Sequence, residues 1–271
     1  MPEGSSLSPV IISKLALWVV VIAVVTLLLR RKEVGERVRL GFLVVGTIVF
    51  GFVYSVLVGQ GTNPNPVFSL RTFLTAAVSD PGTVFGPVFI MLVVLLLMVW
   101  VSNKSICGWG CQLGLLQDLL YRVPLPKWKP SFWVSNTVRI VAFAGLVIGL
   151  VVLGFDWIGA ADPFQLFLGE IAVAVAALSA VVLIASVFIY RPWCQFLCPF
   201  GLVGWLLEQI SVQKPRINRE VCKECQLCVT ACPTQAMSDI YQGKKLHADC
   251  FACGACLDVC PQEEALNWRR K

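Results

Sequence analysis

The stretch CKECQLCVTACP (Cys222–Pro233), which returns as CFACGACLDVCP (Cys250–Pro261), decides the fold of the C-terminal part of the chain. Both runs space their cysteines C-x2-C-x2-C-x3-C-P, and together they hold eight of the twelve cysteines. Three thiolates spaced in this way wrap one face of an iron–sulfur cubane in a tight turn, and the fourth ligand comes from elsewhere. Two runs in tandem therefore predict two 4Fe-4S clusters, with zinc binding as a weak alternative.

The spacing is that of two-cluster bacterial ferredoxins, in which the last cysteine of each run binds the cluster of the other run. We expect one cluster to be bound by Cys222, Cys225, Cys228 and Cys260. We expect the second to be bound by Cys232, Cys250, Cys253 and Cys256. Backbone amides in these turns are expected to donate hydrogen bonds to the cluster sulfurs, which helps to set the redox potential.

The remainder of the chain is strongly apolar. Of its 271 residues, 57% are hydrophobic and 14% are charged, a composition that excludes an ordinary soluble domain. A bilayer core requires about 20 apolar residues per helix, and five stretches approach that length. They run from about residue 7 to 29, 39 to 59, 85 to 101, 138 to 154 and 171 to 190. The predicted fold class is a mostly α, integral membrane helical bundle with a small C-terminal α+β ferredoxin-type domain.

Basic residues alternate between the predicted loops. The first loop carries RRKEVGERVR (30–39) and the third carries Lys104, Arg122, Lys127 and Lys129, whereas the second has only Arg71 and the fourth has none. Cytoplasmic loops carry the excess of Lys and Arg, so we expect the N-terminus outside and the ferredoxin domain in the cytoplasm, at the inner membrane. This topology accounts for the net charge of +6 without nucleic-acid binding.

Three regions are predicted. Residues 1–38 form an additional membrane span with a basic loop, because the apolar stretch is too long for a cleaved signal and lacks a small-residue cleavage site. Residues 39–213 form the membrane bundle, and residues 214–271 form the ferredoxin-type domain.

The other four cysteines form two C-x3-C pairs within the bundle. Cys107 and Cys111 lie in SICGWGCQLG, and Cys194 and Cys198 lie in RPWCQFLCPFG, with an offset of 87 residues between the pairs (194 − 107 and 198 − 111). This offset indicates an internal repeat of a helix pair, a cysteine pair just inside the cytoplasmic end of a span, and an interfacial amphipathic helix.

Two such pairs close together make a potential four-thiolate site. Amides at the start of the following helices would lower the thiol pKa values and favour ligation. The site is open to four interpretations: a third iron–sulfur centre, a copper or zinc site, a redox dithiol, or cysteines that pack as small hydrophobic residues.

Haem is excluded from the bundle by counting, because His247 is the only histidine and lies between the ferredoxin runs, where a surface or packing role is expected. Electrons must then come from a lipid-soluble carrier such as quinone, from a partner subunit or from a soluble donor. An apolar slot with a few polar groups suits a quinone. Plausible side chains for such a slot are those of Trp109, Gln112, Asp118, Trp193 and Gln195.

The order of membrane hairpin, CGWGCQLG, second hairpin, WCQFLCP and two ferredoxin runs resembles the membrane ferredoxin-type subunits of quinol dehydrogenases, typified by NapH of periplasmic nitrate reduction. The C-terminal half of the nitrous oxide reductase regulator and the methylamine-utilisation ferredoxins are similar. The resemblance covers about residue 39 to the end. It implies quinol oxidation at the membrane, with delivery through a partner ferredoxin or cytochrome to a periplasmic reductase.

The motifs match this family with two departures. The ferredoxin cysteines and the segment Cys194–Pro199 match fully, but Gln112 stands where the family has proline after the second cysteine. The first span is also additional to the four helices of the family.

Three functions are compatible with these features. The leading hypothesis is an electron-transfer subunit of a quinone-linked membrane oxidoreductase complex. The second is a metal-handling assembly factor that reduces copper at the C-x3-C cysteines, and the third is a membrane-bound redox sensor.

Overall fold

Helices dominate the computed structural model, which describes residues 9–57, 65–79, 82, 85–169, 172–262 and 264–270. Five long apolar helices coincide with the five predicted apolar stretches. Three of them are long and apolar enough to cross a membrane: Pro9–Arg31, Glu36–Val56 and Phe132–Leu153. Pro87–Ser102 and Val173–Phe188 are apolar but shorter. The predicted helical membrane fold is confirmed, while residues 7–8, 58–59 and 171 of the predicted stretches lie outside the described residues.

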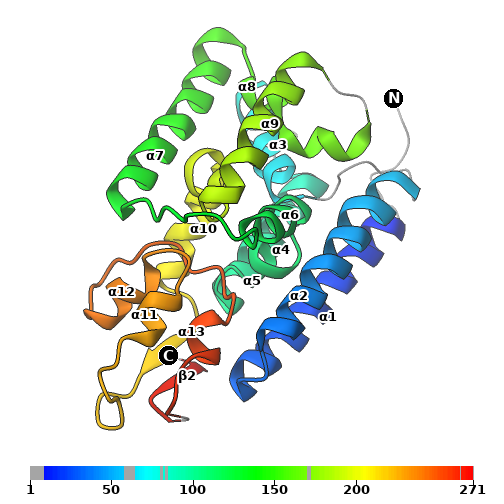
Figure 1. The fold of residues 1–271 in the computed structure, drawn as a ribbon. Coiled ribbons are helices and arrows are strands. Elements are labelled where there is room, and N and C mark those ends of the chain that lie inside the picture. Colours follow the sequence, from blue (N-terminus) through cyan, green and yellow to red (C-terminus); the bar gives the residue numbers. More distant parts are fainter. Residues whose placement is uncertain are drawn as a thin grey trace.

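The first two helices form a long hairpin along one side of the molecule (Figure 1). α1 (Pro9–Arg31) is followed by α2 (Glu36–Gly46), which continues as the wider π-helix η1 (Thr47–Leu57). The hairpin leaves many valine, leucine and isoleucine side chains exposed, such as Val20 and Val45. Exposed apolar surface of this extent marks a contact with lipid or with another protein.

Two copies of one helical unit form the centre of the bundle. The elements of the first copy are α4 (Pro87–Ser102), α5 (Ser105–Trp109) and α6 (Gln112–Tyr121). Those of the second are α9 (Val173–Phe188), η5 (Trp193–Leu197) and α10 (Pro199–Gln209). Between them lies α7 (Phe132–Ile148), which continues as η3 (Gly149–Leu153).

The prediction that α6 and α10 are interfacial helices is wrong. α6 packs against α2 and α9, and α10 packs against α4 and α7, so most residues of both helices are buried. The glycines and leucines that gave these segments an amphipathic appearance allow this close packing inside the bundle.

Two segments that we predicted as outer loops fold back into the bundle. α3 (Pro66–Ser79) packs against α4 and α10 and buries Val67 and Leu70. α8 (Trp157–Ala161) and η4 (Pro163–Leu168) pack against α9, and η4 also contacts η1. Aspartates start both short helices, because Asp156 accepts a hydrogen bond from the amide of Gly159 and Asp162 from that of Phe164.

The C-terminal domain lies at the end of the bundle opposite α8 (Figure 1). β1 (Gln213–Ile217) pairs antiparallel with β2 (Leu266–Arg270), which confirms the small α+β domain. Three short helices lie between the strands: α11 (Leu227–Ala231), α12 (Ala236–Tyr241) and α13 (Ala255–Asp258).

The core of this domain is continuous with the bundle. Val25 and Leu29 of α1 and Trp109 of α5 belong to the same buried cluster as Met237 and Trp268. A Cβ atom on Gly254 would lie 2.8 Å from Cγ1 of Val34, so the turn after α1 fits directly against the second cysteine run. The additional N-terminal helix therefore covers the ferredoxin domain rather than standing apart from it.

Candidate functional site

One cavity in the C-terminal domain gathers cysteines from both runs. It is lined by Cys222, Cys225, Cys228 and Cys260. Glu224 and Gln226 adopt the left-handed conformation, with φ of 54° and 56°, so the chain turns sharply between successive cysteines. The structure thus brings together the four cysteines that we predicted to share one cluster.

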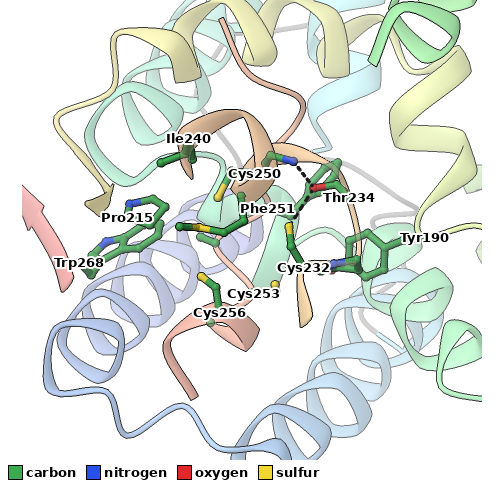
Figure 2. Close-up of a pocket in the computed structure, with 15 residues that line it drawn as sticks. Tyr190, Pro215, Cys232, Thr234, Ile240, Cys250, Phe251, Cys253, Cys256 and Trp268 are labelled. Atoms are coloured by element: carbon green, nitrogen blue, oxygen red, sulfur yellow. Dashed lines mark hydrogen bonds between the residues drawn. The ribbon is translucent and has the colours of Figure 1, made fainter. Parts of the chain in front are cut away.

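A second cavity gathers the other four cysteines of the runs (Figure 2). They are Cys232, Cys250, Cys253 and Cys256. Thr234 fixes this region, because its hydroxyl lies 3.5 Å from Sγ of Cys232 and donates to the carbonyl oxygen of Asp249 at 2.8 Å. Trp268 from β2 and Tyr190 from the bundle also line this cavity, and the two side chains lie on opposite sides of it.

A third cavity lies inside the bundle and gathers both C-x3-C pairs. It is lined by Cys107, Cys111, Cys194 and Cys198, all of them buried. Pro66 and Val67 of α3, Phe164 of η4 and Phe251 of the second ferredoxin run complete its wall. The internal repeat therefore produces one four-cysteine site, and segments from opposite ends of the molecule enclose it.

Each of the three cavities offers four thiols, which is the number of ligands of a 4Fe-4S cluster. Among the described residues, no three Cys, His, Asp or Glu side chains are close enough to bind one metal ion. A cubane separates its thiolate ligands more widely than one tetrahedral metal does, and the donor sets are compatible with such a cluster.

The helices that follow the two C-x3-C pairs begin directly at the site. Cys111 and Cys198 precede α6 and α10 with nearly the same backbone angles, −79° and 115° against −67° and 117°. The glutamine at position 112 therefore preserves the turn that proline makes in the second motif. The amide of Gly201 donates to Sγ of Cys198 at 3.2 Å, so the start of α10 stabilises negative charge on that sulfur.

Two buried cations occupy equivalent positions of the repeat. Lys104 and Arg191, 87 residues apart, lie three residues before the first cysteine of each pair, are fully buried and have positive φ of 56° and 50°. Arg191 donates to the carbonyl oxygens of Cys107 and Gly108. Lys104 donates to the carbonyl oxygen of Gly201 at 3.3 Å. Each cation thus ties its own half of the repeat to the other half.

Asp118 on α6 neutralises part of this buried charge. One of its oxygens accepts from Arg39 at 2.6 Å, from Arg191 at 2.9 Å and from the hydroxyl of Tyr190 at 2.6 Å. Burial alone would raise the pKa of this carboxyl group, but the two guanidinium groups and the hydroxyl outweigh burial and hold the pKa at about 2. Asp118 therefore stays ionised in the folded protein at any ordinary pH.

The second ferredoxin run is fastened to the bundle by charge and by backbone contacts. Asp249 forms buried ion pairs with Lys104 and with Arg139 of α7. The indole of Trp109 donates to the carbonyl oxygen of Ala252 at 2.8 Å, and the amide of Cys250 donates to Glu208 of α10 at 2.6 Å. The second and third cavities are therefore held at a fixed separation.

A cleft of about 360 Å³ opens between α2, α6 and the second ferredoxin run. Arg39, Asp118 and Tyr121 contribute polar groups, and Cys253 of the second cavity lies in its wall. Arg39 is 96% buried, and its guanidinium lies over the ring of Trp109, with Cζ 4.0 Å from the ring centroid. The cleft therefore places polar groups next to a cysteine of the second set.

Of the five side chains predicted for a quinone slot, only that of Asp118 lines this cleft. The other four have structural contacts. Trp193 lines the third cavity, and Trp109 donates to the carbonyl oxygen of Ala252. Gln195 donates to the carbonyl oxygen of Tyr190, and Gln112 donates to the hydroxyl of Ser55 at 3.5 Å. His247 is buried and lines none of the five described cavities.

Sequence reasoning missed Lys104, Arg191 and Phe251. The first two could have been found from the repeat, since a basic residue precedes both cysteine pairs at the same distance. Nothing in the sequence distinguishes Phe251 from any other residue between ferredoxin cysteines.

Comparison with known families identifies 4Fe-4S domains in the segments that carry the cysteines. The family described as a 4Fe-4S dicluster domain matches residues 214–264. The family described as a 4Fe-4S binding domain matches twice, at residues 84–131 and 171–218. The two matches are offset by 87 residues (171 − 84), which is the offset between the C-x3-C pairs. The two matches thus cover the two halves of the internal repeat, each with its C-x3-C pair.

Several proteins are similar over most of the chain. Ferredoxin-type protein NapH of Haemophilus influenzae is 24% identical over 73% of this chain and 72% of its own length. YccM of Escherichia coli is 24% identical over 69% of this chain, and regulatory protein NosR of Pseudomonas aeruginosa is 26% identical over 85%. The chain spans 57% of the length of YccM and 33% of that of NosR. No solved structure matches the chain.

Proposed function

Because the chain belongs to the NapH-type membrane ferredoxin family, we propose that it is the electron-transfer subunit of a quinone-linked oxidoreductase complex. The family and the fold make it a membrane iron–sulfur electron-transfer protein. The finer proposal adds three 4Fe-4S clusters, one in each four-cysteine cavity, and quinone or quinol as the lipid-soluble redox partner.

The observation that carries the cluster proposal is the grouping of all twelve cysteines into three sets of four. Two sets, Cys222/Cys225/Cys228/Cys260 and Cys232/Cys250/Cys253/Cys256, have ferredoxin spacing, and the third consists of Cys107/Cys111/Cys194/Cys198. Bound there, the clusters would supply one-electron oxidation and reduction.

The protein's own residues would hold and tune the third cluster. Four thiolates carry more negative charge than a cubane core carries positive charge, so the site must stabilise an anion. Lys104 and Arg191 are buried beside the cysteine loops, and the amide of Gly201 donates to a ligand sulfur. These groups favour the thiolate form and raise the potential of an anionic centre.

The cleft beside Cys253 is the proposed site for the quinone headgroup. The ring would lie in this cleft beside the side chains of Arg39, Asp118 and Tyr121, whose polar groups line it. Quinol oxidation there would release two electrons, one at a time, to the iron–sulfur sites and two protons to water at the mouth of the cleft.

The proposed location is the inner membrane, with the ferredoxin domain in the cytoplasm. Its support is the alternation of basic and non-basic loops in the sequence. The proposed partners are the quinone pool and other redox subunits, namely a ferredoxin, a cytochrome or a reductase.

Iron and acid-labile sulfide per chain, measured on protein purified anaerobically, test the cluster assignment. About twelve irons are expected for three clusters, and about eight for two clusters. The Cys194→Ser variant should lose about four irons and one EPR signal while both ferredoxin signals remain. Stoichiometric copper in place of the third set of irons would instead support the assembly-factor hypothesis.

Binding of decylubiquinone to purified protein tests the cleft. Arg39→Gln and the milder Tyr121→Phe should both weaken binding and slow the reduction of the clusters by decylubiquinol. The matched control is Arg37→Gln, because Arg37 lies on the same helix but is exposed and does not line the cleft. Equal binding by wild type and both cleft variants would reject this site.

A further inference from the structure

Phe251 is shared by two of the cysteine cavities. Its side chain lies in the wall of the second cavity, beside Cys250 and Cys253 (Figure 2), and also in the wall of the third cavity, beside Cys107 and Cys194. Among the described residues, Phe251 alone lines both cavities. The second ferredoxin site and the buried site are therefore neighbours that share this residue.

The position of this ring is fixed on several sides. Phe251 is 2% exposed, and Tyr190 packs edge-on against it with the ring centroids 5.8 Å apart. Nζ of Lys104 lies 4.9 Å from the ring centroid, and Cζ of Arg191 lies 5.2 Å from it. These are cation–π distances, so both buried cations of the repeat hold the ring between the two sites.

The far wall of the third cavity belongs to the other end of the molecule. Phe164, in η4, lines the cavity, and Leu168 at the end of the same short helix is 43% exposed. A 3₁₀-helix rises about 2 Å per residue, so four residues span only about 8 Å between cavity and surface. Figure 1 shows that the ferredoxin domain and α8, which precedes η4, lie at opposite ends of the bundle.

We infer that the third cavity is the intermediate site of an electron-transfer path through the bundle. Electrons would reach it from the second ferredoxin site across Phe251 and would pass from it to an acceptor at the surface that carries η4. The inference rests on the proposed third cluster. Clusters held by the two cysteine sets would pass electrons one at a time, each oxidised as the next is reduced, and a one-electron acceptor at the η4 surface would complete the transfer. No bond is made or broken, and no proton has to move.

The charges around Phe251 favour such a path. Lys104 and Arg191 contact the ring, and their charges are partly balanced by Glu208, Asp249 and Asp118. Attraction between the cations and a negative charge added to a neighbouring site is strengthened by the low dielectric constant of a buried region.

Sealed vesicles of phosphatidylethanolamine and phosphatidylglycerol that contain the full chain and enclose ferricyanide provide the test. Dithionite is added outside, and the bleaching of the enclosed ferricyanide reports electrons that cross the bilayer. Wild type should bleach ferricyanide faster than protein-free vesicles. Cys194→Ser should lose this activity.

Variants of Phe251 test the contact itself. Phe251→Ala and Phe251→Leu should slow transfer with the full iron content retained, and Phe251→Tyr should restore it. The matched control is Phe155→Ala, since Phe155 is exposed and lines none of the three cysteine cavities. A second readout is EPR of the reduced protein, in which the second ferredoxin signal should broaden through magnetic interaction with the third centre and sharpen in Cys194→Ser.

The iron content and the transfer rate test the third cluster and the electron path separately. About twelve irons with no transfer across the bilayer, or with no magnetic interaction, would overturn the path and leave the three-cluster proposal standing. About eight irons would overturn the third cluster and the path together, while the two ferredoxin clusters would stand. Transfer as fast in Phe251→Ala and Phe251→Leu as in wild type would overturn the role of Phe251.

Discussion

Gly108, in the first C-x3-C motif, lies against the carbonyl oxygen of Phe251, in the second ferredoxin run, so closely that a Cβ atom at position 108 would overlap that oxygen. Two segments more than 140 residues apart in sequence therefore meet backbone to backbone. The carbonyl oxygen of Gly108 is occupied as well, since it accepts from Arg39 and Arg191. This contact sets the distance between the bundle and the ferredoxin domain.

Gly108→Ala should push the ferredoxin domain away from the bundle. Adding one methyl group to a packed site usually costs about 1–3 kcal/mol, and here the neighbour is backbone, which has little room to move. The midpoint of thermal unfolding in detergent should fall, and trypsin should cut the linker after α10 faster. Gly145→Ala is the control: nothing lies within 4 Å of a Cβ there, so it should be neutral or slightly stabilising.

Single substitutions can test whether the last cysteine of each ferredoxin run binds the cluster of the other run. Cys260→Ser should remove the cluster of the first set and preserve the magnetic interaction between the second cluster and the third, because Cys260 lines only the first cavity. Cys232→Ser should abolish that interaction. If each run instead bound its own cluster with all four cysteines, the two variants would give the reverse result.

Asp118→Asn should destabilise the folded protein strongly. The substitution leaves Arg39 and Arg191 buried without their carboxylate, and removing one partner of a buried ion pair costs about 3–5 kcal/mol. Glu36→Gln is a suitable control, because Glu36 pairs with Arg122 at the surface and such pairs contribute about 0–1 kcal/mol. Equal unfolding midpoints for both variants would contradict the network described for Asp118.

Asp162 should make the folded protein more stable at acidic pH than at neutral pH, which is the opposite of ordinary acid denaturation. Burial raises the pKa of this carboxyl group to about 6, despite the hydrogen bond from Phe164 and the nearby Arg71. Since the folded pKa lies above the ordinary pKa of an aspartate, about 4, the folded form binds the proton more tightly, and stability falls as pH rises from about 4 to about 6.

The matched variant is Asp162→Asn, which keeps an oxygen to accept from the amide of Phe164. It should remove this pH dependence and raise the free energy of unfolding at pH 7 by about 2–3 kcal/mol, the equivalent of about two pKa units. Thermal unfolding in detergent at pH 4 and pH 7 measures both effects. An unchanged difference between the two pH values in the variant would rule out Asp162 as its source.

The sequence was sufficient to predict the repeat and which ferredoxin cysteines line a common cavity, because both depend on spacing along the chain. Lys104 was misread for a physical reason. Positive-inside counting treats every loop lysine as solvated, whereas this one is buried in ion pairs with Asp249 and Glu208. A pairing between residues more than 100 positions apart leaves no trace in local composition.

The inward fold of the outer segments was equally hidden. α3 and η4 are short, begin at proline and follow turn-forming residues, which is the composition of an exposed loop. Their burial depends on space created by the two repeat units, and no local pattern encodes that space. The same is true of the position of Phe251 between two cavities.

Lys104 and Arg191 each donate to a carbonyl oxygen in the other half of the repeat, so neither half is complete alone. The carbonyl oxygen of Cys107 receives its donor from Arg191, and that of Gly108 accepts from Arg191 as well as from Arg39, so the first cysteine loop lacks part of its donors until the second half of the chain has been synthesised. The proposed third cluster takes two cysteines from each half, so its assembly would have to follow the synthesis of both halves.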